Sequence, residues 1–284
     1  MRTLTNRMNL PQAIVNAVTN DPYDGGDCDI SVTRLIAPPY QRQLMGKVEQ
    51  IEDVSDRIWA LIGQATHTIL ERAYPDKDNC DVHSDTLVEQ RLYTNELGWR
   101  ISGAFDVYEG GTLFDYKVTS AWSVIGETKI EWEQQLNLLR LLAIRNGITV
   151  NSLRIIAILR DWSKMKAKTD SNYPQAQVVP VDIPVWSEEA AKAYLISRVA
   201  AHQNDMPLPC TPMDRWQRDD VYAVMKEGRK SAVKLHSDET TAVAHASELG
   251  KAHTVVKRPG ESIRCASYCS VAHGCPVYQS EVPF

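Results

Sequence analysis

One stretch near the middle of the chain, GAFDVYEGGTLFDYKVTS from Gly103 to Ser120, most constrains how the protein can fold. Its two apolar runs flank a Gly-Gly pair, which suits the tight turn of a β-hairpin. Because side chains alternate along a strand, Asp115 and Lys117 share one face, among apolar neighbours that indicate burial. A buried charge is costly unless it is paired or binds a metal, so the hairpin predicts a functional site.

A second carboxylate strengthens this prediction. Asp106 lies on the first strand of the hairpin, so the turn brings it close to Asp115. Two carboxylates at short range repel each other, and one takes up a proton unless a cation lies between them. Mg²⁺ favours oxygen ligands and commonly uses one or two carboxylates. We therefore expect Mg²⁺ or Mn²⁺ here; the alternative is an exposed ion pair between Asp115 and Lys117 on an edge strand.

The surrounding pattern predicts an α/β fold. Apolar residues recur at helical spacing over 46–74, with His67 near the end of that helix, and again over 130–145. Alternating or strongly apolar runs predict strands, and a capping serine precedes a further helix. The strands are expected at 87–93, 99–109, 111–119, 152–162 and 178–184, and the further helix at 187–204.

The character of the chain changes at Pro207. A proline-rich link, MPLPCTPMDRW, is followed by a strand–strand–helix–strand pattern over 221–258 and by a cysteine-rich end. We expect a core with an N-terminal helical segment over 1–208. A small ββαβ insert and a metal-binding tail would occupy 209–284.

Composition narrows the setting. The chain has 284 residues, of which 43% are hydrophobic, and a formal net charge of −5, so it is not a basic nucleic-acid coat. It contains no apolar run long enough for a membrane span and no signal-peptide pattern, so we expect a cytoplasmic protein without a membrane partner. Its six cysteines then favour metal binding or free thiols over disulfides.

The order of these features resembles the PD-(D/E)XK nuclease superfamily. The pattern Asp106…Asp115-x-Lys117, with His67 in GQATHTILE and Gln135 in WEQQLNLL, is similar to RecB-type nucleases and phage recombination exonucleases. The resemblance covers roughly residues 30–165 and the cysteine tail. It implies a restriction-endonuclease-like core, with a mixed central sheet flanked by helices.

The resemblance also implies roles for these residues. Lys117 would position the attacking water and stabilise the charge that develops on phosphorus, and Gln135, rather than Gln134, would orient the lysine or a water. Leu139 stands where the family often has a tyrosine. The implied ligands of one or two Mg²⁺ or Mn²⁺ ions are His67, Asp106, Asp115 and the backbone carbonyl of Tyr116.

The implied activity is metal-dependent hydrolysis of DNA phosphodiesters, by an exonuclease of recombination, replication or repair. The alternative is a non-catalytic DNA-binding or assembly protein that keeps the nuclease fold. DNA is the expected partner. A single-strand annealing or recombination protein and a second copy of this chain are further partners to be tested.

The cysteine tail has the spacing C-x3-C-x5-C, formed by Cys265, Cys269 and Cys275. Thiolates suit zinc or an iron–sulfur cluster, and both usually take four protein ligands. The spacing resembles the terminal triad of iron–sulfur nucleases, including CRISPR adaptation nucleases and the AddB subunit, so we expect [4Fe–4S], with Zn²⁺ as the alternative.

The fourth thiolate is a separate question. In those nucleases it precedes a proline near the N-terminus, where this chain has Ala37 before Pro38. Cys28 and Cys80 lie beside aspartates that disfavour a thiolate. Cys210 lies between prolines with no adjacent charge, and we expect it to complete the set.

DNA binding also requires cations along the path of the phosphates. Trp122 and Trp162 are candidates for stacking on an unpaired base. The candidate phosphate contacts are Arg34, Arg42, Lys164, Lys166, Lys168, Lys226, Arg229, Lys230 and Lys234.

Overall fold

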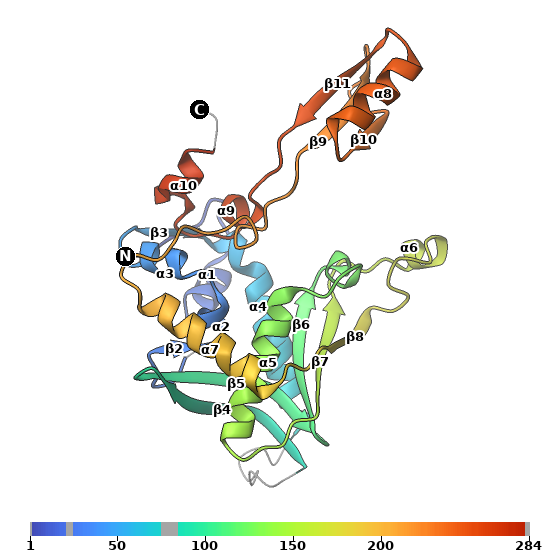
Figure 1. The fold of residues 1–284 in the computed structure, drawn as a ribbon. Coiled ribbons are helices and arrows are strands. Elements are labelled where there is room, and N and C mark those ends of the chain that lie inside the picture. Colours follow the sequence, from blue (N-terminus) through green and yellow to red (C-terminus); the bar gives the residue numbers. More distant parts are fainter. Residues whose placement is uncertain (1, 21–24, 75–84, 282–284) are drawn as a thin grey trace. The chain divides into compact units, whose positions relative to one another are not determined.

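A computed structural model describes residues 2–20, 25–74 and 85–281 (Figure 1). The chain divides into two compact units. The larger comprises residues 2–39 and 51–207, and the smaller comprises residues 40–50 and the chain from 208 onward. The boundary predicted after residue 208 separates the C-terminal part from the core, and the contacts group residues 40–50 with that part as well.

The larger unit contains a set of strands followed or flanked by helices. Its strands are β1 (Arg2–Thr5), β2 (Ile30–Ser31), β3 (Gln50–Asp53), β4 (Thr86–Glu96), β5 (Trp99–Glu109), β6 (Thr112–Thr119), β7 (Ser152–Leu159) and β8 (Val178–Ile183). Its helices are α1 (Gln12–Thr19), α2 (Val32–Ile36), η1 (Val54–Arg57), α4 (Ile58–Glu71), η3 (Ala121–Val124), α5 (Ile130–Arg145), α6 (Lys164–Thr169) and α7 (Glu188–Gln203). In the described part of the chain, no helix is both long and apolar enough to cross a membrane.

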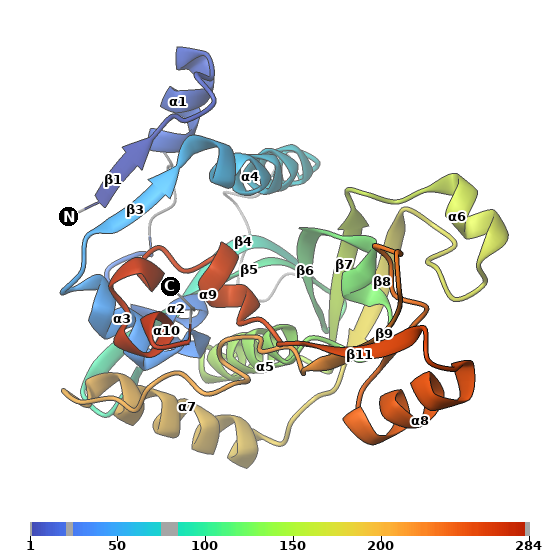
Figure 2. The same ribbon diagram turned by 90° about the horizontal axis from the view of Figure 1, so that it is seen from above.

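Six of these strands form one mixed sheet. The order is β2-β5-β6-β7-β8, and β4 also pairs with β5. Strand β7 is parallel to β6 and antiparallel to β8. Figure 2 shows α4 on one side of this sheet and α5 with α7 on the other. The predicted α/β class, with a mixed central sheet and flanking helices, is therefore confirmed at this level.

Strand β5 has a gap along one edge. On that edge it pairs with β2 at Ile101 and Ser102 and with β6 only from Val107 to Glu109. Between these points the Asp106 carboxylate replaces the backbone ladder, because its Oδ2 accepts a hydrogen bond of 2.6 Å from the Tyr116 N–H. The two strands of the hairpin thus separate at the position of the predicted site.

Helix α5 closes over the sheet because the sequence supplies a glycine at the point of closest approach. A Cβ on Gly103 would lie 2.5 Å from Leu139 Cδ2 and 3.2 Å from Leu142 Cδ2. The helix can pack this closely only because residue 103 has no side chain. Leu139, Leu142 and their neighbours on α5 belong to the main hydrophobic core. The helix ends at Arg145 as predicted, and Asn146 and Gly147 follow it, with Gly147 at φ 82°.

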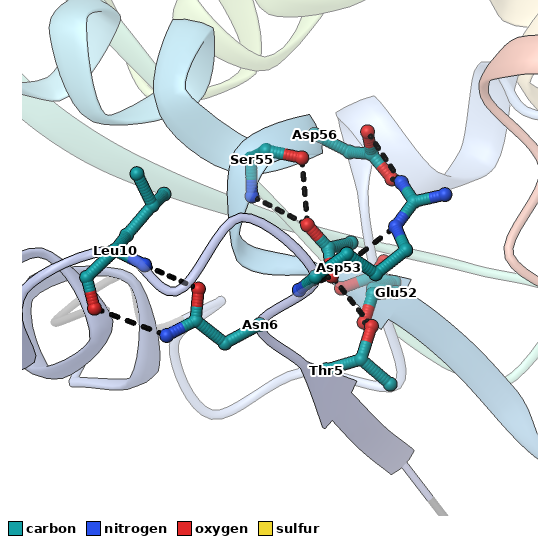
Figure 3. Close-up of polar contacts among 8 residues, drawn as sticks. Thr5, Asn6, Leu10, Glu52, Asp53, Ser55 and Asp56 are labelled. Carbon is teal, nitrogen blue, oxygen red and sulfur yellow. Dashed lines mark hydrogen bonds and ion pairs between the residues drawn. The ribbon is translucent and has the colours of Figure 1, made fainter.

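The helix predicted over 46–74 is wrong at its start. Residues Gln50–Asp53 form β3, which pairs with β1, and the helix α4 begins only at Ile58. Figure 3 shows the reason: the Asp53 carboxylate accepts hydrogen bonds from Thr5 Oγ1, the Arg7 N–H and Ser55. These contacts fix Asp53 in an extended conformation, so the chain can enter a helix only after it.

The smaller unit contains the predicted strand–strand–helix–strand element. Strand β9 (Val221–Lys226) lies between β10 (Lys234–His236) and β11 (His253–Arg258), and α8 (Glu239–Leu249) packs on them around a small core. Asp238 caps α8 by accepting from the Thr241 N–H at 2.8 Å. The unit also holds the short helices α3 (Pro39–Met45), α9 (Ile263–Ser267), η4 (Ala272–Gly274) and α10 (Pro276–Gln279).

Candidate functional site

A cavity of about 740 Å³ lies at the gap beside β5. Helices α2, α4 and α5 and strands β4, β5 and β6 all contribute to its wall. Its polar lining residues include His67, Glu89, Asp106, Asp115, Lys117 and Gln135. Five of these six were predicted from the sequence, and the structure brings those five into one cavity; Tyr116, whose carbonyl was also predicted, does not line it.

Asp115 is the most deeply buried charge of the site. Its Oδ2 forms an ion pair of 2.6 Å with Lys117 Nζ, and its Oδ1 accepts a hydrogen bond of 3.2 Å from Gln135 Nε2. No residue that the structure describes donates a well-directed hydrogen bond to Oδ2. Gln135 therefore reaches the site as expected, and burial of Asp115 excludes the alternative of an exposed ion pair on an edge strand.

On the α4 side of the cavity, one imidazole is shared by two carboxylates. His67 Nδ1 lies 3.3 Å from Asp106 Oδ1 and 3.7 Å from Glu89 Oε1. One ligand atom from each of these residues lies within 4.8 Å of the other two, which is close enough for all three to hold one metal ion. The expected ligands were His67, Asp106, Asp115 and the Tyr116 carbonyl; this group contains two of them, His67 and Asp106, with Glu89 in place of Asp115.

The three carboxylates create an excess of negative charge. Hydrogen bonds with Asp106 and then Glu89 raise the pKa of His67 to about 10, so the imidazole carries a proton at neutral pH. Burial raises the pKa of Asp115 to about 6, opposed by the positive charge of Lys117. In the absence of another cation, the negative charge of the cavity therefore favours the protonated forms of His67 and Asp115.

A divalent metal fits this donor set. Carboxylate oxygens are the ligands that Mg²⁺ and Mn²⁺ prefer, and a neutral imidazole nitrogen is an acceptable addition for Mn²⁺. A metal between Asp106 and Glu89 would take the place of the proton on His67 and relieve the same repulsion. The predicted role of the Tyr116 carbonyl stays a prediction; what the structure shows is its N–H bound to Asp106.

Glu89 was missed by the sequence reasoning. It lies on β4 between residues that pair with Phe105 and Val107, and is therefore opposite Asp106. Its φ of 48° is unusual for a residue other than glycine, and such strained conformations persist mainly at functional positions. The alternating pattern of LVEQRLY identified the strand, but only its register with β5 reveals the carboxylate as part of the site.

The four predicted cysteines line a second, much smaller cavity of about 20 Å³ in the smaller unit. In the part of the chain that the structure describes, no three of their sulfurs lie within 4.8 Å of one another. A tetrahedral zinc site, with Zn–S near ~2.3 Å, needs sulfurs about 3.8 Å apart. The four thiols, from Cys210, Cys265, Cys269 and Cys275, are therefore neighbours but do not form a compact tetrahedral set.

Burial favours the protonated form of three of these thiols. Burial raises the pKa of Cys210 to about 12 and that of Cys265 to about 11, and burial also raises the pKa of Cys269. Cys28 lies elsewhere, in the larger unit, where its sulfur contacts the Ser102 hydroxyl at 3.1 Å. Cys80 lies outside the described residues.

The candidate DNA contacts separate into different groups. Trp122 leaves 65% of its surface exposed, whereas Trp162 is committed to packing, since its Nε1 donates to the Pro174 carbonyl at 2.7 Å. Helix α6 carries Lys164, Lys166 and Lys168. The remaining candidates are Arg34 in the larger unit and Arg42, Lys226, Arg229, Lys230 and Lys234 in the smaller one.

Comparison with known proteins gives no family for this chain. No family model and no curated protein sequence matches it. A solved structure described as "Crystal structure of SSO0001" is similar over 66% of this chain and 83% of that chain, at 15% sequence identity and a TM-score of 0.42. A likeness of that size carries no argument about fold or function, so the proposals below depend on the geometry of the site.

Proposed function

We propose that this protein is a metal-dependent DNA nuclease with a core of the PD-(D/E)XK type. The observation that carries the proposal is the convergence of Asp106, Asp115, Lys117 and His67 on one open cavity. The Asp…Asp-x-Lys pattern is short and says little by itself. Its side chains meet His67 only because the hairpin and α4 have this arrangement.

Each residue has a task that its position supports. Asp106, Glu89 and His67 offer metal ligands, and a bound Mg²⁺ or Mn²⁺ would polarise a phosphoryl oxygen and lower the pKa of a bound water. Lys117 is held by Asp115, so its ammonium is directed at the cavity, where it can orient a water and stabilise charge on phosphate. Gln135 fixes the other oxygen of Asp115.

The test is cleavage of end-labelled linear and circular DNA in Mg²⁺, Mn²⁺ or EDTA. Metal-dependent hydrolysis is expected from the unaltered protein and not from Lys117→Ala. Lys192→Ala, an exposed lysine on α7, is the matched control and should retain full activity. DNA binding without hydrolysis in either metal would favour the alternative, a non-catalytic DNA-binding or assembly protein. Release of end nucleotides from linear DNA alone would support exonuclease action.

We further propose that Cys210, Cys265, Cys269 and Cys275 bind one [4Fe–4S] cluster. The support is that all four line one cavity although Cys210 is far from the others in sequence. When bound, the cluster would replace four thiol protons and tie residues 208–284 to residues 40–50, which contribute Tyr40 and Gln41 to the same cavity.

Anaerobically purified protein should then be brown and contain iron and sulfide. Cys210→Ser should lose the metal and destabilise the smaller unit, because metal binding to such sites is a large part of the folding free energy. Cys28→Ser, outside the cavity, should retain it. Colourless protein with one zinc would replace the cluster by Zn²⁺ and keep the ligand set, and full metal retention by Cys210→Ser would refute the ligand set.

A further inference from the structure

Two exposed tryptophans lie beside the end of the sheet that carries the candidate site. Trp59, in the first turn of α4, leaves 51% of its surface exposed, and Trp122, just after β6, leaves 65% exposed. Large aromatic side chains are costly to leave in water, so a pair of them in one part of the surface calls for an explanation.

Each tryptophan ring is paired with a cation. The Arg160 guanidinium lies 4.3 Å from the centroid of the Trp59 ring, and Lys166 Nζ lies 5.7 Å from that of Trp122. Tyr173 supports Trp122 from the side, at 6.5 Å between centroids in an edge-on arrangement. The combination of an exposed aromatic face and an adjacent positive charge is the one that binds a nucleobase and its phosphate together.

The two pairs belong to the same end of the sheet. Arg160 follows β7 directly, and its N–H donates to the carbonyl of Thr119, the last residue of β6. Trp122 follows Thr119 by three residues, and the Asp161 carboxylate holds that turn through Ser120 and the Ala121 N–H. Figure 1 shows β6 and β7 ending together, with α6 beyond them. The Asp161 carboxylate is thus occupied by hydrogen bonds within the turn.

Trp59 lies on the same side of α4 as two residues that line the cavity. Residues four apart lie on one side of a helix, so Trp59, Gly63 and His67 form one line. Gly63 and His67 both line the cavity, and a Cβ on Gly63 would meet nothing within 4 Å. Along this side of α4, the exposed ring of Trp59 is followed by the uncrowded position of Gly63 and then by the candidate metal ligand His67.

We propose that Trp59, Arg160, Trp122 and Lys166 form a stacking track that binds single-stranded DNA and directs it into the cavity. This proposal rests on the proposed function and specifies the form of the substrate. Single strands expose the faces of their bases, whereas a duplex buries them in its own stack. The aromatic and cationic groups of the track match the bases and phosphates of a single strand. Because the formal net charge of the whole chain is −5, these cations are a local feature of the surface.

The test measures binding in EDTA, where no hydrolysis occurs. Fluorescence anisotropy would compare a labelled oligothymidylate with a duplex of the same length, for the unaltered protein, Trp59→Leu and Trp122→Leu. Leucine keeps an apolar side chain but has no aromatic face. Stacking on one base predicts that each variant binds the single strand about 5- to 100-fold more weakly. Binding to the duplex should change by less than about twofold, since it makes no stacking contact.

Three further variants separate stacking from damage to the fold. Trp59→Phe and Trp122→Phe retain a π-face and should recover most of the affinity. Met165→Ala, an exposed apolar side chain on the same helix as Lys166, should have no effect. Equal losses for single strand and duplex, or no loss with either leucine variant, would overturn the track.

The two proposals fail in different ways. A protein that binds single strands through these tryptophans but hydrolyses no DNA in Mg²⁺ or Mn²⁺ would support the track and refute the nuclease. A protein that hydrolyses DNA with unchanged affinity in both leucine variants would refute the track and leave the nuclease standing.

Discussion

Asp53 and Asp115 lie in the same unit and each leaves 3% of its side chain exposed, but their surroundings differ. Asp53 accepts hydrogen bonds from Thr5, Arg7 and Ser55, and these hold its pKa well below the usual range (Figure 3). Asp115 forms an ion pair with Lys117 and accepts one hydrogen bond, from Gln135, yet burial raises its pKa to about 6.

The difference separates a structural carboxylate from one prepared for chemistry. Around Asp53 every contact stabilises the charge, so the network is complete without a ligand. Around Asp115 the charge is only partly satisfied and a second carboxylate, Asp106, adds to the repulsion. Perturbed groups of this kind, at the wall of a cavity, are typical of functional sites. The comparison therefore predicts that the two aspartates respond oppositely to the same substitution.

The largest expected effect comes from Asp115→Asn. It should lower metal-dependent DNA cleavage by at least about 10²- to 10³-fold, as loss of a principal electrostatic group does in other enzymes. The free energy of unfolding should stay equal or rise, because burial in the folded chain disfavours the Asp115 charge more than Lys117 stabilises it, as the raised pKa indicates. Asp53→Asn should do the reverse, with full cleavage and a lower denaturation midpoint. Equal effects of the two variants on both measurements would break the distinction.

The second effect concerns Glu89, which lines the same cavity as Asp115 and belongs to the group that could hold a metal. Glu89→Gln keeps the shape and removes the charge. It should weaken Mn²⁺ binding about 10- to 100-fold, measured by calorimetry, since a ligand or its immediate partner is altered. Glu109→Gln, at the exposed β5–β6 turn, is the control and should leave the affinity unchanged. Unchanged affinity in Glu89→Gln would remove this residue from the metal site.

A third prediction tests the packing that holds the cavity open on its α5 side. Gly103→Ala should lower the free energy of unfolding by about 1–3 kcal/mol, because the new Cβ would overlap Leu139. Gly63→Ala, in open space within α4, should raise it by about 0.5–1 kcal/mol through helix propensity. Urea unfolding of the two variants measures the contrast. A stable Gly103→Ala would mean that α5 does not need this close approach.

The sequence predicted most of the site because its spacing is local. Asp106, Asp115 and Lys117 lie on one hairpin, so the two-residue period of a strand is enough to relate them. Gln135 needed the helix that follows, and its hydrogen bond to Asp115 distinguishes it from its neighbour Gln134. Glu89 was out of reach, because its role depends on the register of β4 against β5 and on a φ of 48° that no pattern reveals.

The start of α4 was predicted wrongly for a similar reason. Apolar residues continue at helical spacing back to Val48, so the pattern favours one long helix. Strand β3 forms instead of a helix because Asp53 accepts a hydrogen bond from Thr5, 48 residues earlier in the chain. Contacts so far apart in sequence override a local periodicity, and the same contacts give the smallest of the predicted effects.

That last effect is the pH dependence of the Asp53 network. Because the folded-state pKa of Asp53 lies below its unfolded value near ~3.9, the carboxylate stabilises the folded chain above that pH. The contribution is lost as the pH falls below about 3.9 toward the folded-state pKa. The difference in urea midpoint between the unaltered protein and Asp53→Asn should therefore be constant from about pH 7 to pH 5 and shrink below about pH 4. Asp56→Asn, which alters only an exposed ion pair with Arg7, should show little difference at any pH. A difference that grows on acidification would mean that Asp53 is protonated more readily in the folded chain, and would place it with Asp115 rather than opposite to it.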